Sequence, residues 1–477
     1  MIWFAVGLIL GFLAVLVTRA ALFRPKEETP PEPCMPEFDR ELAVEHLRGM
    51  IRCKTVSRED PADEDDAEFA RFRQLIREYY PTVFERGEVE QVPPRTLLIR
   101  IRGRESGDPT VLMAHYDVVP AEEENWKQPP FEAKIVDGEL WGRGSLDTKI
   151  TDLGILESTE NLLKQGFVPK VDLYIALGGD EETHGLGARN SVELFRQRGI
   201  TPGFVLDEGG AVVDNVFPGV KERCALIGTA EKGFMNACFT IESDGGHAST
   251  PPAKSNIGRL ADAVRRVEAK PFPARLSAPI AEMFDTLGRR STFLYRLIFA
   301  NIRIFLPLLS ALYKRKGGEL NAMLRTTVAF TMMEGSAAHN VMPPKASMLA
   351  NLRLMNGDSV GSAVAQLQEL AGDSSITVSP AGTCNDPSPE SRTDCEQWRQ
   401  LRTAVAQTWP DAVISPYLML QCSDAYYYSQ ISPYVYRFCA MALSAEQRGT
   451  IHGRNERISV DAVAETVGFY MNLLRQR

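Results

Sequence analysis

The chain has 477 residues, of which 44% are hydrophobic, and its formal net charge is −9 at pH 7. This length exceeds what one simple hydrophobic core accommodates, so two or three domains are expected. The sequence has no long basic run interleaved with aromatic residues, which disfavours nucleic acid as a partner. Its eight cysteines include no CxxC pair in a chain this long, which excludes a small disulfide-rich scaffold.

The first 23 residues are almost entirely apolar. Residues 2–17, IWFAVGLILGFLAVLV, carry no charge, and the apolar stretch continues to residue 23 with Arg19 as an interruption. About 20 apolar residues span a bilayer, so residues 1–23 are predicted to form a single-pass transmembrane anchor. A cleaved signal peptide is the alternative, but no basic residue precedes the apolar core, and TRA is a poor cleavage site.

The residues after this helix bear on its orientation. Arg19, Arg24 and Lys26 lie on its C-terminal side, which favours a cytoplasmic body by the positive-inside rule, although the sequence leaves the topology open. Residues 24–37, RPKEETPPEPCMPE, are rich in proline and glutamate and are interpreted as an extended linker that holds the body off the membrane.

Residues 38–230 alternate between helical and strand-like patterns. The strand-like runs are TLLIRIRG (96–103), TVLMAHYDVVP (110–120), VDLYIALGGDEE (171–182) and PGFVLDEGG (202–210), and the helical runs include 41–51, 147–166 and 188–199. This alternation predicts a mostly parallel sheet covered by helices on both faces, with its ligand site beyond the carboxyl ends of the strands. His115, Asp117, Glu181, Glu182, Asp207 and Glu208 all fall there.

The order of predicted strands and helices changes over residues 231–380. Strands near 234–243, 326–335, 345–356 and 375–382, and helices near 256–269 and 358–372, follow the order β-α-β-β-α-β of a ferredoxin-like unit. Residues 381–477 return to the earlier order and end in an amphipathic helix. We therefore expect an α/β catalytic domain formed by residues 38–230 and 381–477, interrupted by a lid or dimerisation domain.

An insertion of roughly residues 271–324 lies within the ferredoxin-like unit and contains FLYRLIFANIRIFLPLLSALYKRK. Arg296, Arg303 and Pro307 argue against a second membrane span. We interpret the insertion as amphipathic helical cover for a partner subunit, an apolar substrate or the bilayer surface. Ordinary packing within the lid explains the pattern equally well.

Five residues at predicted strand ends or in adjoining loops have side chains that suit zinc. They are His115, Asp147, Glu182, Glu208 and His452. Five ligands are one more than a single tetrahedral zinc takes, but they suit two zinc ions roughly 3.5–4 Å apart that share a bridging carboxylate, for which Asp147 is the natural candidate. Asp117 could fix the tautomer of His115, and Glu181 is well placed as a general base for a metal-activated water.

Seven ordered blocks resemble the signatures of the co-catalytic dizinc aminoacylase and carboxypeptidase peptidase family. They are MAHYDVVP (113–120), WGRGSLDTK (141–149), GGDEETHG (178–185), VLDEGG (205–210), GHASTPP (246–252), HNVMPP (339–344) and IHGRNERISVD (451–461). Within this family, GTAEKGFMN (228–236), LRTTVAFT (324–331) and the apolar insertion are most similar to the carboxypeptidase S and N-fatty-acyl amino acid synthase/hydrolase branch.

The resemblance implies roles for individual residues. His115, Asp147 and Glu208 would hold one zinc ion, and Asp147, Glu182 and His452 the other, with Asp207 as the alternative to Glu208. Glu181 would be the base and Asp117 the residue that orients the histidine. His247 would stabilise the oxyanion, often from the partner chain of a homodimer. Asn340 and Arg353 would bind the substrate, Arg353 through the substrate carboxylate.

One position departs from the family pattern. Near SDAYYY, residues 423–428, relatives usually have a basic residue where this chain has Tyr426. The predicted function is zinc-dependent hydrolysis of amide bonds in N-acyl amino acids or at the C-terminus of short peptides. A catalytically impaired zinc-binding protein, and a dizinc hydrolase of another amide or ester, are the alternatives.

Overall fold

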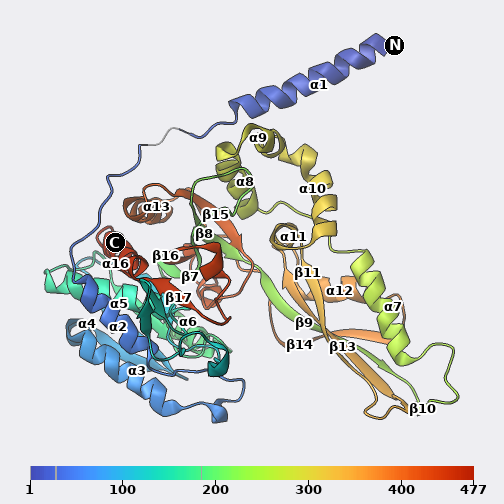
Figure 1. Ribbon diagram of the computed structural model, residues 1–477, viewed down its shortest axis with the longest axis horizontal. Coiled ribbons are helices and arrows are strands. Elements are labelled where there is room, and N and C mark those ends of the chain that lie inside the picture. Colours follow the sequence, from blue (N-terminus) through green and yellow to red (C-terminus); the bar gives the residue numbers. More distant parts are fainter. Residues whose placement is uncertain (1, 27–28, 184) are drawn as a thin grey trace.

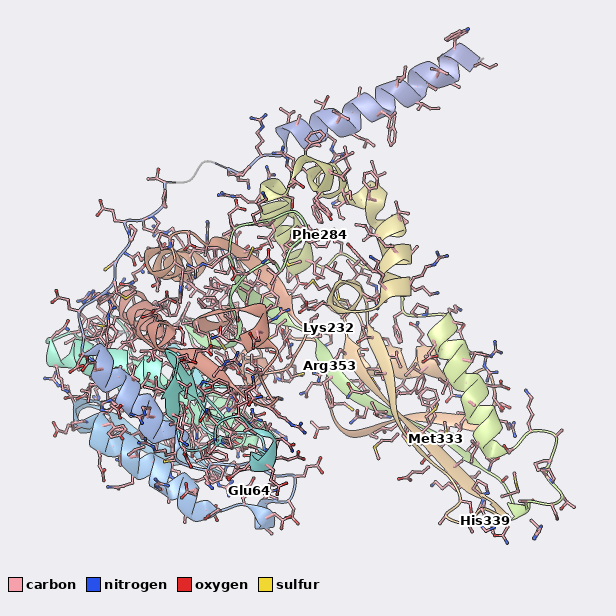
Figure 2. All side chains as sticks on the ribbon, viewed as in Figure 1. Glu64, Lys232, Phe284, Met333, His339 and Arg353 are labelled. Carbon is pink, nitrogen blue, oxygen red and sulfur yellow. The ribbon has the colours of Figure 1, made fainter. Side chains whose placement is uncertain are left out.

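The structure is a computed structural model, which describes residues 2–26, 29–183 and 185–477. Figure 1 shows two units side by side, each built on its own β-sheet, with a long N-terminal helix projecting away from them. The chain passes from the larger unit to the smaller one at Lys232, which Figure 2 labels between them. Lys232 is buried there, and its Nζ donates to the carbonyl oxygens of Ala322 and Arg325 at 2.9 and 2.8 Å.

The larger unit contains a mixed sheet in the order β1-β2-β6-β3-β7-β16-β8-β15. Its strands are β1 (Glu88–Val92), β2 (Thr96–Ile101), β3 (Thr110–His115), β6 (Leu173–Gly178), β7 (Phe204–Val213), β8 (Cys224–Glu231), β15 (Val413–Met419) and β16 (Val435–Leu443). The central strands β6, β3, β7 and β16 are parallel, whereas β1, β2 and β6 are antiparallel neighbours. The prediction of a mostly parallel sheet therefore holds for the centre and for the pair β8–β15. The β8 strand runs antiparallel to β7 and β16, and the short turn between β1 and β2 permits only antiparallel pairing of those two strands.

Helices cover both faces of this sheet, which is why β3 and β6 consist of buried residues throughout. One face packs against α2 (Arg40–Ile51), α3 (Asp66–Tyr79), α4 (Pro81–Arg86), α5 (Lys149–Lys164), α13 (Glu396–Thr408) and α16 (Val460–Leu474). The other face packs against α6 (Leu186–Gln197) and the short α14 (Ala425–Tyr428). A small sheet of β4 (Lys134–Val136), β5 (Glu139–Trp141) and β17 (Arg457–Ser459) joins the segment before Asp147 to the one after His452.

The smaller unit has an antiparallel sheet in the order β11-β13-β9-β14, packed against two helices. Its elements are β9 (Gly233–Glu242), α7 (Asn256–Ala269), β11 (Thr327–Glu334), β13 (Lys345–Leu354), α12 (Val360–Ala371) and β14 (Ile376–Asn385). The chain therefore follows the order β-α-β-β-α-β in this unit. A two-stranded ribbon of β10 (Gly246–His247) and β12 (Val341–Met342) forms the end of the unit farthest from the larger sheet (Figure 1).

The insertion between α7 and β11 forms four helices. They are α8 (Ala278–Arg290), α9 (Phe293–Phe299), α10 (Ile302–Lys316) and α11 (Glu319–Leu324). Ile280, Met283 and Leu287 of α8 are buried in a cluster with side chains of β8 and β15, so α8 covers the outer edge of the larger sheet. Packing within the smaller unit alone therefore does not account for the insertion.

The N-terminal helix α1 (Ile2–Leu22) is long and apolar enough to cross a membrane, as a signal sequence also would be. Its side chains are exposed except for Leu16 and Ala20. Among the described residues between α1 and α2 there is no helix or strand. Part of this linker follows the body, since the N–H of Cys34 donates to Gln407 O and its carbonyl accepts from Asn472 Nδ2, both at 2.9 Å.

Candidate active site

The site lies at the carboxyl ends of the parallel strands β6, β3 and β7, in the middle of the larger sheet. Their carboxyl ends are adjacent because β3 pairs in parallel with both of the other strands. His115 ends β3, Glu181 and Glu182 follow β6, and Glu208 lies within β7. Each apolar strand thus ends close to polar side chains, and the parallel pairing brings these side chains together at the carboxyl ends of the strands.

Asp147 joins two histidines that are 337 positions apart in the chain. His115 Nε2 lies 3.1 Å from Asp147 Oδ1, and His452 Nε2 lies 2.9 Å from Asp147 Oδ2. His452 Nε2 is also 3.1 Å from Glu182 Oε2, and His115 Nε2 is 3.6 Å from Glu208 Oε2. Both histidines thus contact Asp147, and the nearest glutamate of each is a different one.

A β-bulge separates the roles of Asp207 and Glu208. The register between β7 and β16 slips here, because Asp207 pairs with Arg437 while Gly210 pairs with Phe438. Gly209 has φ +142°, a conformation that side chains disfavour, so a glycine is required in the bulge. Asp207 Oδ2 accepts the N–H of Ala425 at 2.7 Å, whereas Glu208 faces His115.

Asp117 lies behind the site and is fully buried. Its carboxylate accepts the backbone N–H groups of Glu181 and Glu182 at 3.2 and 3.1 Å and the hydroxyl of Ser57 at 2.7 Å. One of its oxygens lies 3.5 Å from His115 Nδ1, while that nitrogen is 3.0 Å from the Asp117 carbonyl oxygen. Asp117 therefore fixes both the loop that carries the glutamates and the ring of His115.

The site contains more acidic side chains than imidazoles, so negative charge is in excess. Burial raises the pKa of Glu208 to about 8, and burial together with the charge of Glu208 raises the pKa of Glu181 well above its usual value. Hydrogen bonds to Asp147 and Glu182 raise the pKa of His452 to about 10. These shifts arise because four acidic side chains share a small desolvated space with two imidazoles.

This donor set fits divalent metal ions. His115, Asp147 and Glu182 offer ligand atoms within 4.8 Å of one another, as do His115, Glu181 and Glu208. Glu182 Oε1 is buried without a hydrogen-bond partner, which leaves a lone pair available to a cation. Imidazole and carboxylate together suit zinc, and a cation here would offset the excess negative charge.

Arg143 and Glu456 connect the two loops that carry Asp147 and His452. Glu456 is fully buried and accepts hydrogen bonds from Arg143 Nη1 at 2.6 Å and from the N–H groups of Gly144 and Leu146 at 3.2 and 2.7 Å. The N–H of Asp147 also points to Glu456, at 3.3 Å. Sequence reasoning assigned no role to this pair, although both residues lie within four positions of a candidate ligand in the blocks WGRGSLDTK and IHGRNERISVD.

Three residues predicted to act on the substrate lie outside this cluster. His247 and Asn340 are exposed neighbours at the β10–β12 ribbon, where the N–H of Ala248 donates to Asn340 O at 3.0 Å. Figure 2 labels the adjacent His339 at the far end of the smaller unit, away from the larger sheet. Arg353 lies nearer, at the junction between the units, where its Nη1 is 3.0 Å from Cys422 Sγ. The single chain in this conformation does not bring His247 to the histidine–carboxylate cluster.

The family model of peptidase family M20/M25/M40 matches residues 111–476. The chain is 34% identical to an N-fatty-acyl-amino acid synthase/hydrolase of Xenopus tropicalis, over 99% of this chain and 96% of that protein. It is 33% identical to a probable carboxypeptidase S-like protein of Dictyostelium discoideum, over 98% of this chain and 92% of the relative.

Solved structures share the fold at low identity. The M20 family metallo-carboxypeptidase of Sulfolobus solfataricus has a TM-score of 0.64 at 15% identity, with 92% of this chain and 99% of that chain covered. A Bacillus subtilis protein described as a dinuclear metal-binding peptidase of the M20 family has a TM-score of 0.55 at 12% identity, with 91% and 98% covered. The predicted family resemblance is therefore confirmed.

Proposed function

Since this chain belongs to peptidase family M20/M25/M40 and is a hydrolase of that family, we propose that it cleaves the amide bond of N-acyl amino acids or the last peptide bond of short peptides. The observation that carries the proposal is the pair of histidines joined through Asp147, each with a different glutamate nearest to it. That arrangement matches the chemistry of two metal ions with one bridging carboxylate.

Two zinc ions would be held by these residues. His115, Asp147 and Glu208 would hold one, and Asp147, Glu182 and His452 the other. Glu208 is preferred to Asp207, whose carboxylate already accepts from α14. When bound, the ions would acidify a water molecule and polarise the carbonyl group of the scissile amide.

Glu181 is proposed as the general base. Its Oε2 lies 3.9 Å from His115 Nε2, within the cluster but farther than Asp147 or Glu208. A carboxyl with a raised pKa in a desolvated site is suited to take a proton from the attacking water and return it to the leaving amine. Asp117 holds the Glu181 backbone and so positions this base.

The substitution Glu181→Gln tests this assignment. A base contributes about 10²–10⁴-fold to turnover, so the variant should lose at least that factor while it still binds two zinc ions per chain. Glu182→Gln is the matched control and should lose zinc, since Glu182 is a proposed ligand. Full activity in Glu181→Gln would exclude the mechanism, and loss of zinc would make Glu181 a ligand instead.

His247 is proposed to stabilise the oxyanion from the partner subunit of a homodimer. Its exposed position at the β10–β12 ribbon suits donation to a second chain. Removal of one oxyanion donor costs about 10²–10³-fold in kcat. Mixing inactive Glu181→Gln and His247→Ala chains should therefore restore activity, because some sites would combine an intact Glu181 with an intact His247. No restoration in mixed dimers would refute action in trans.

The substrate carboxylate is proposed to bind Arg353, with Asn340 as a further substrate contact. The apolar insertion and the similarity to N-fatty-acyl-amino acid synthase/hydrolases favour a fatty acyl group. N-lauroyl amino acids and blocked dipeptides should be offered side by side, with and without a chelator. Chelator-sensitive turnover of the acyl substrate alone supports the fatty-acyl assignment. Turnover of neither substrate would favour the alternative of an impaired zinc-binding protein, in which Tyr426, in place of the usual basic residue, would account for the lost activity.

We also propose that α1 anchors the enzyme in a membrane. The helix carries no charge from Ile2 to Thr18, and its side chains are exposed except for those of Leu16 and Ala20. Resistance of the full chain to alkaline extraction from membranes would support this, and an N-terminus that begins after residue 22 in the mature protein would show instead that α1 is a cleaved signal.

A further inference from the structure

Helices α9 and α10 present an exposed apolar surface that neither the catalytic site nor the core explains. They meet at an angle of 101°, and together they are as apolar as a membrane span. Leu294 on α9 is 68% exposed and Leu308 on α10 is 65% exposed. Phe293, Tyr295, Ile304 and Leu312 are exposed as well.

On α10 the exposed apolar residues follow helical spacing. Ile304, Leu308 and Leu312 lie four residues apart and therefore share one face. Leu309 is buried on the opposite face, from which Leu306 and Tyr313 pack against the cluster shared with α8 and β15. The helix thus has two apolar faces, of which only one is covered by protein.

Within the chain segment that forms this surface every charged side chain is basic, and of these Arg289 is paired with Asp285 of α8. From Arg289 to Gly318 the sequence contains no aspartate or glutamate. The same stretch contains seven basic residues, which are Arg289, Arg290, Arg296, Arg303, Lys314, Arg315 and Lys316. Apolar residues flanked by cations are typical of helices that lie at the surface of an anionic membrane.

The contact between α1 and α9 fixes where this surface lies. Ala20 of α1 is fully buried, and Asn301, also buried, donates from Nδ2 to Leu16 O at 3.2 Å. The Arg289 guanidinium lies over the Phe23 ring at 4.4 Å and donates to Arg24 O at 3.0 Å. Figure 1 shows α1 leaving the body beside α9, so α9 lies level with the C-terminal end of the apolar helix.

We propose that the exposed faces of α9 and α10, here called the α9–α10 surface, dock on a bilayer that contains anionic phospholipid, next to the point where α1 enters it. The proposal rests on the assignment of α1 as an anchor but not on the catalytic assignment. A second copy of this chain fits the surface less well, because the interspersed cations would face one another across a two-fold contact. A bilayer with anionic phospholipid offers hydrocarbon for the exposed apolar side chains and negative charge for the basic ones.

Tryptophan quenching in the full chain tests the proposal. The variants Leu294→Trp and Leu308→Trp are reconstituted into phosphatidylcholine/phosphatidylserine vesicles whose acyl chains carry bromine, and the wild-type signal is subtracted. Val168→Trp is the control, because Val168 is 41% exposed in the loop between α5 and β6. Unchanged thermal unfolding confirms that all three variants fold.

We expect several-fold stronger quenching at positions 294 and 308 than at 168, and weaker quenching at 294 and 308 in vesicles without phosphatidylserine. Quenching equal to that of the control, in vesicles where alkaline extraction shows α1 to be inserted, would overturn the proposal. If quenching at positions 294 and 308 falls as the protein concentration rises, a second copy of the chain covers this surface, and the proposal is overturned. Neither readout uses turnover, so a failure here is distinguishable from a failure of the proposed reaction.

Discussion

Replacing Arg143 with methionine should reveal how much the candidate metal centre depends on the buried Arg143–Glu456 pair. Methionine keeps the apolar stem of the side chain but removes the guanidinium group and its charge. Glu456 would then retain only backbone donors, and Gly453 O would lose the 2.8 Å hydrogen bond from Arg143 Nη2. Breaking a buried ion pair by removing one partner costs about 3–5 kcal/mol, because the remaining charge stays desolvated.

The effect should extend to the metal ions. Glu456 accepts from Leu146 N and Asp147 N, so a displaced carboxylate would loosen the backbone that aims the proposed bridging ligand. Loss of such a supporting contact lowers metal affinity by about 10–100-fold. Urea unfolding followed by circular dichroism measures the stability, and competition with a chromophoric chelator measures the metal affinity.

Arg454→Met is the matched control, from the loop that carries His452 and Glu456. Arg454 is exposed and lies 3.5 Å from Glu122, and exposed pairs contribute only about 0–1 kcal/mol. The reasoning fails if Arg143→Met and Arg454→Met destabilise the chain equally, or if Arg143→Met binds metal as tightly as the wild type.

Three further predictions concern the buried acid Asp152 and two residues, Arg353 and Tyr426, that the family resemblance links to the substrate. Burial raises the pKa of Asp152 to about 8, whereas an aspartate in an unfolded chain has a pKa of about 3.9. The folded chain therefore binds the extra proton between these values, and stability falls as the pH rises from about 4 to about 8. Asp152→Asn should reduce that fall in urea unfolding of the metal-free protein, and an identical pH dependence would contradict the assignment. Arg353→Ala should lower kcat/KM by about 10–100-fold for substrates with a free carboxylate, because a hydrogen bond to a charged group contributes about 1.5–3 kcal/mol, and should leave amidated analogues unaffected. Tyr426→Arg should raise kcat/KM for short peptides relative to N-lauroyl amino acids in the same assay, and an unchanged ratio would show that Tyr426 does not set the preference.

The local sequence was sufficient to predict the strands that frame the site. The run TVLMAH is apolar through β3 and ends in His115, and LYIALG of β6 is followed within four residues by Glu181 and Glu182. Strands buried on both faces must be apolar throughout, so a polar residue at the end of such a run marks the rim of the sheet. The same short-range patterns carried the family resemblance, and the family match confirmed it.

Contacts between distant segments were decided only by the tertiary structure. The Arg143–Glu456 pair joins residues 313 positions apart, and the sequence around each residue does not predict that the two will pair. The cover of β15 by α8, and the contact of Asn301 with α1, likewise depend on how the elements pack and not on their own periodicity.

The sequence by itself therefore determined the strands that frame the site, which of their ends carry acids and histidines, and to which family the chain belongs. The tertiary structure decided the antiparallel edge of the sheet, the choice of Glu208 over Asp207 as the neighbour of His115, and the distance of His247 from the cluster. The reason is physical. Helical and strand periodicity, and the residues that end each run, are properties of neighbouring residues, whereas strand order, a bulge and the placement of one unit beside another depend on the burial of surfaces contributed by the whole chain.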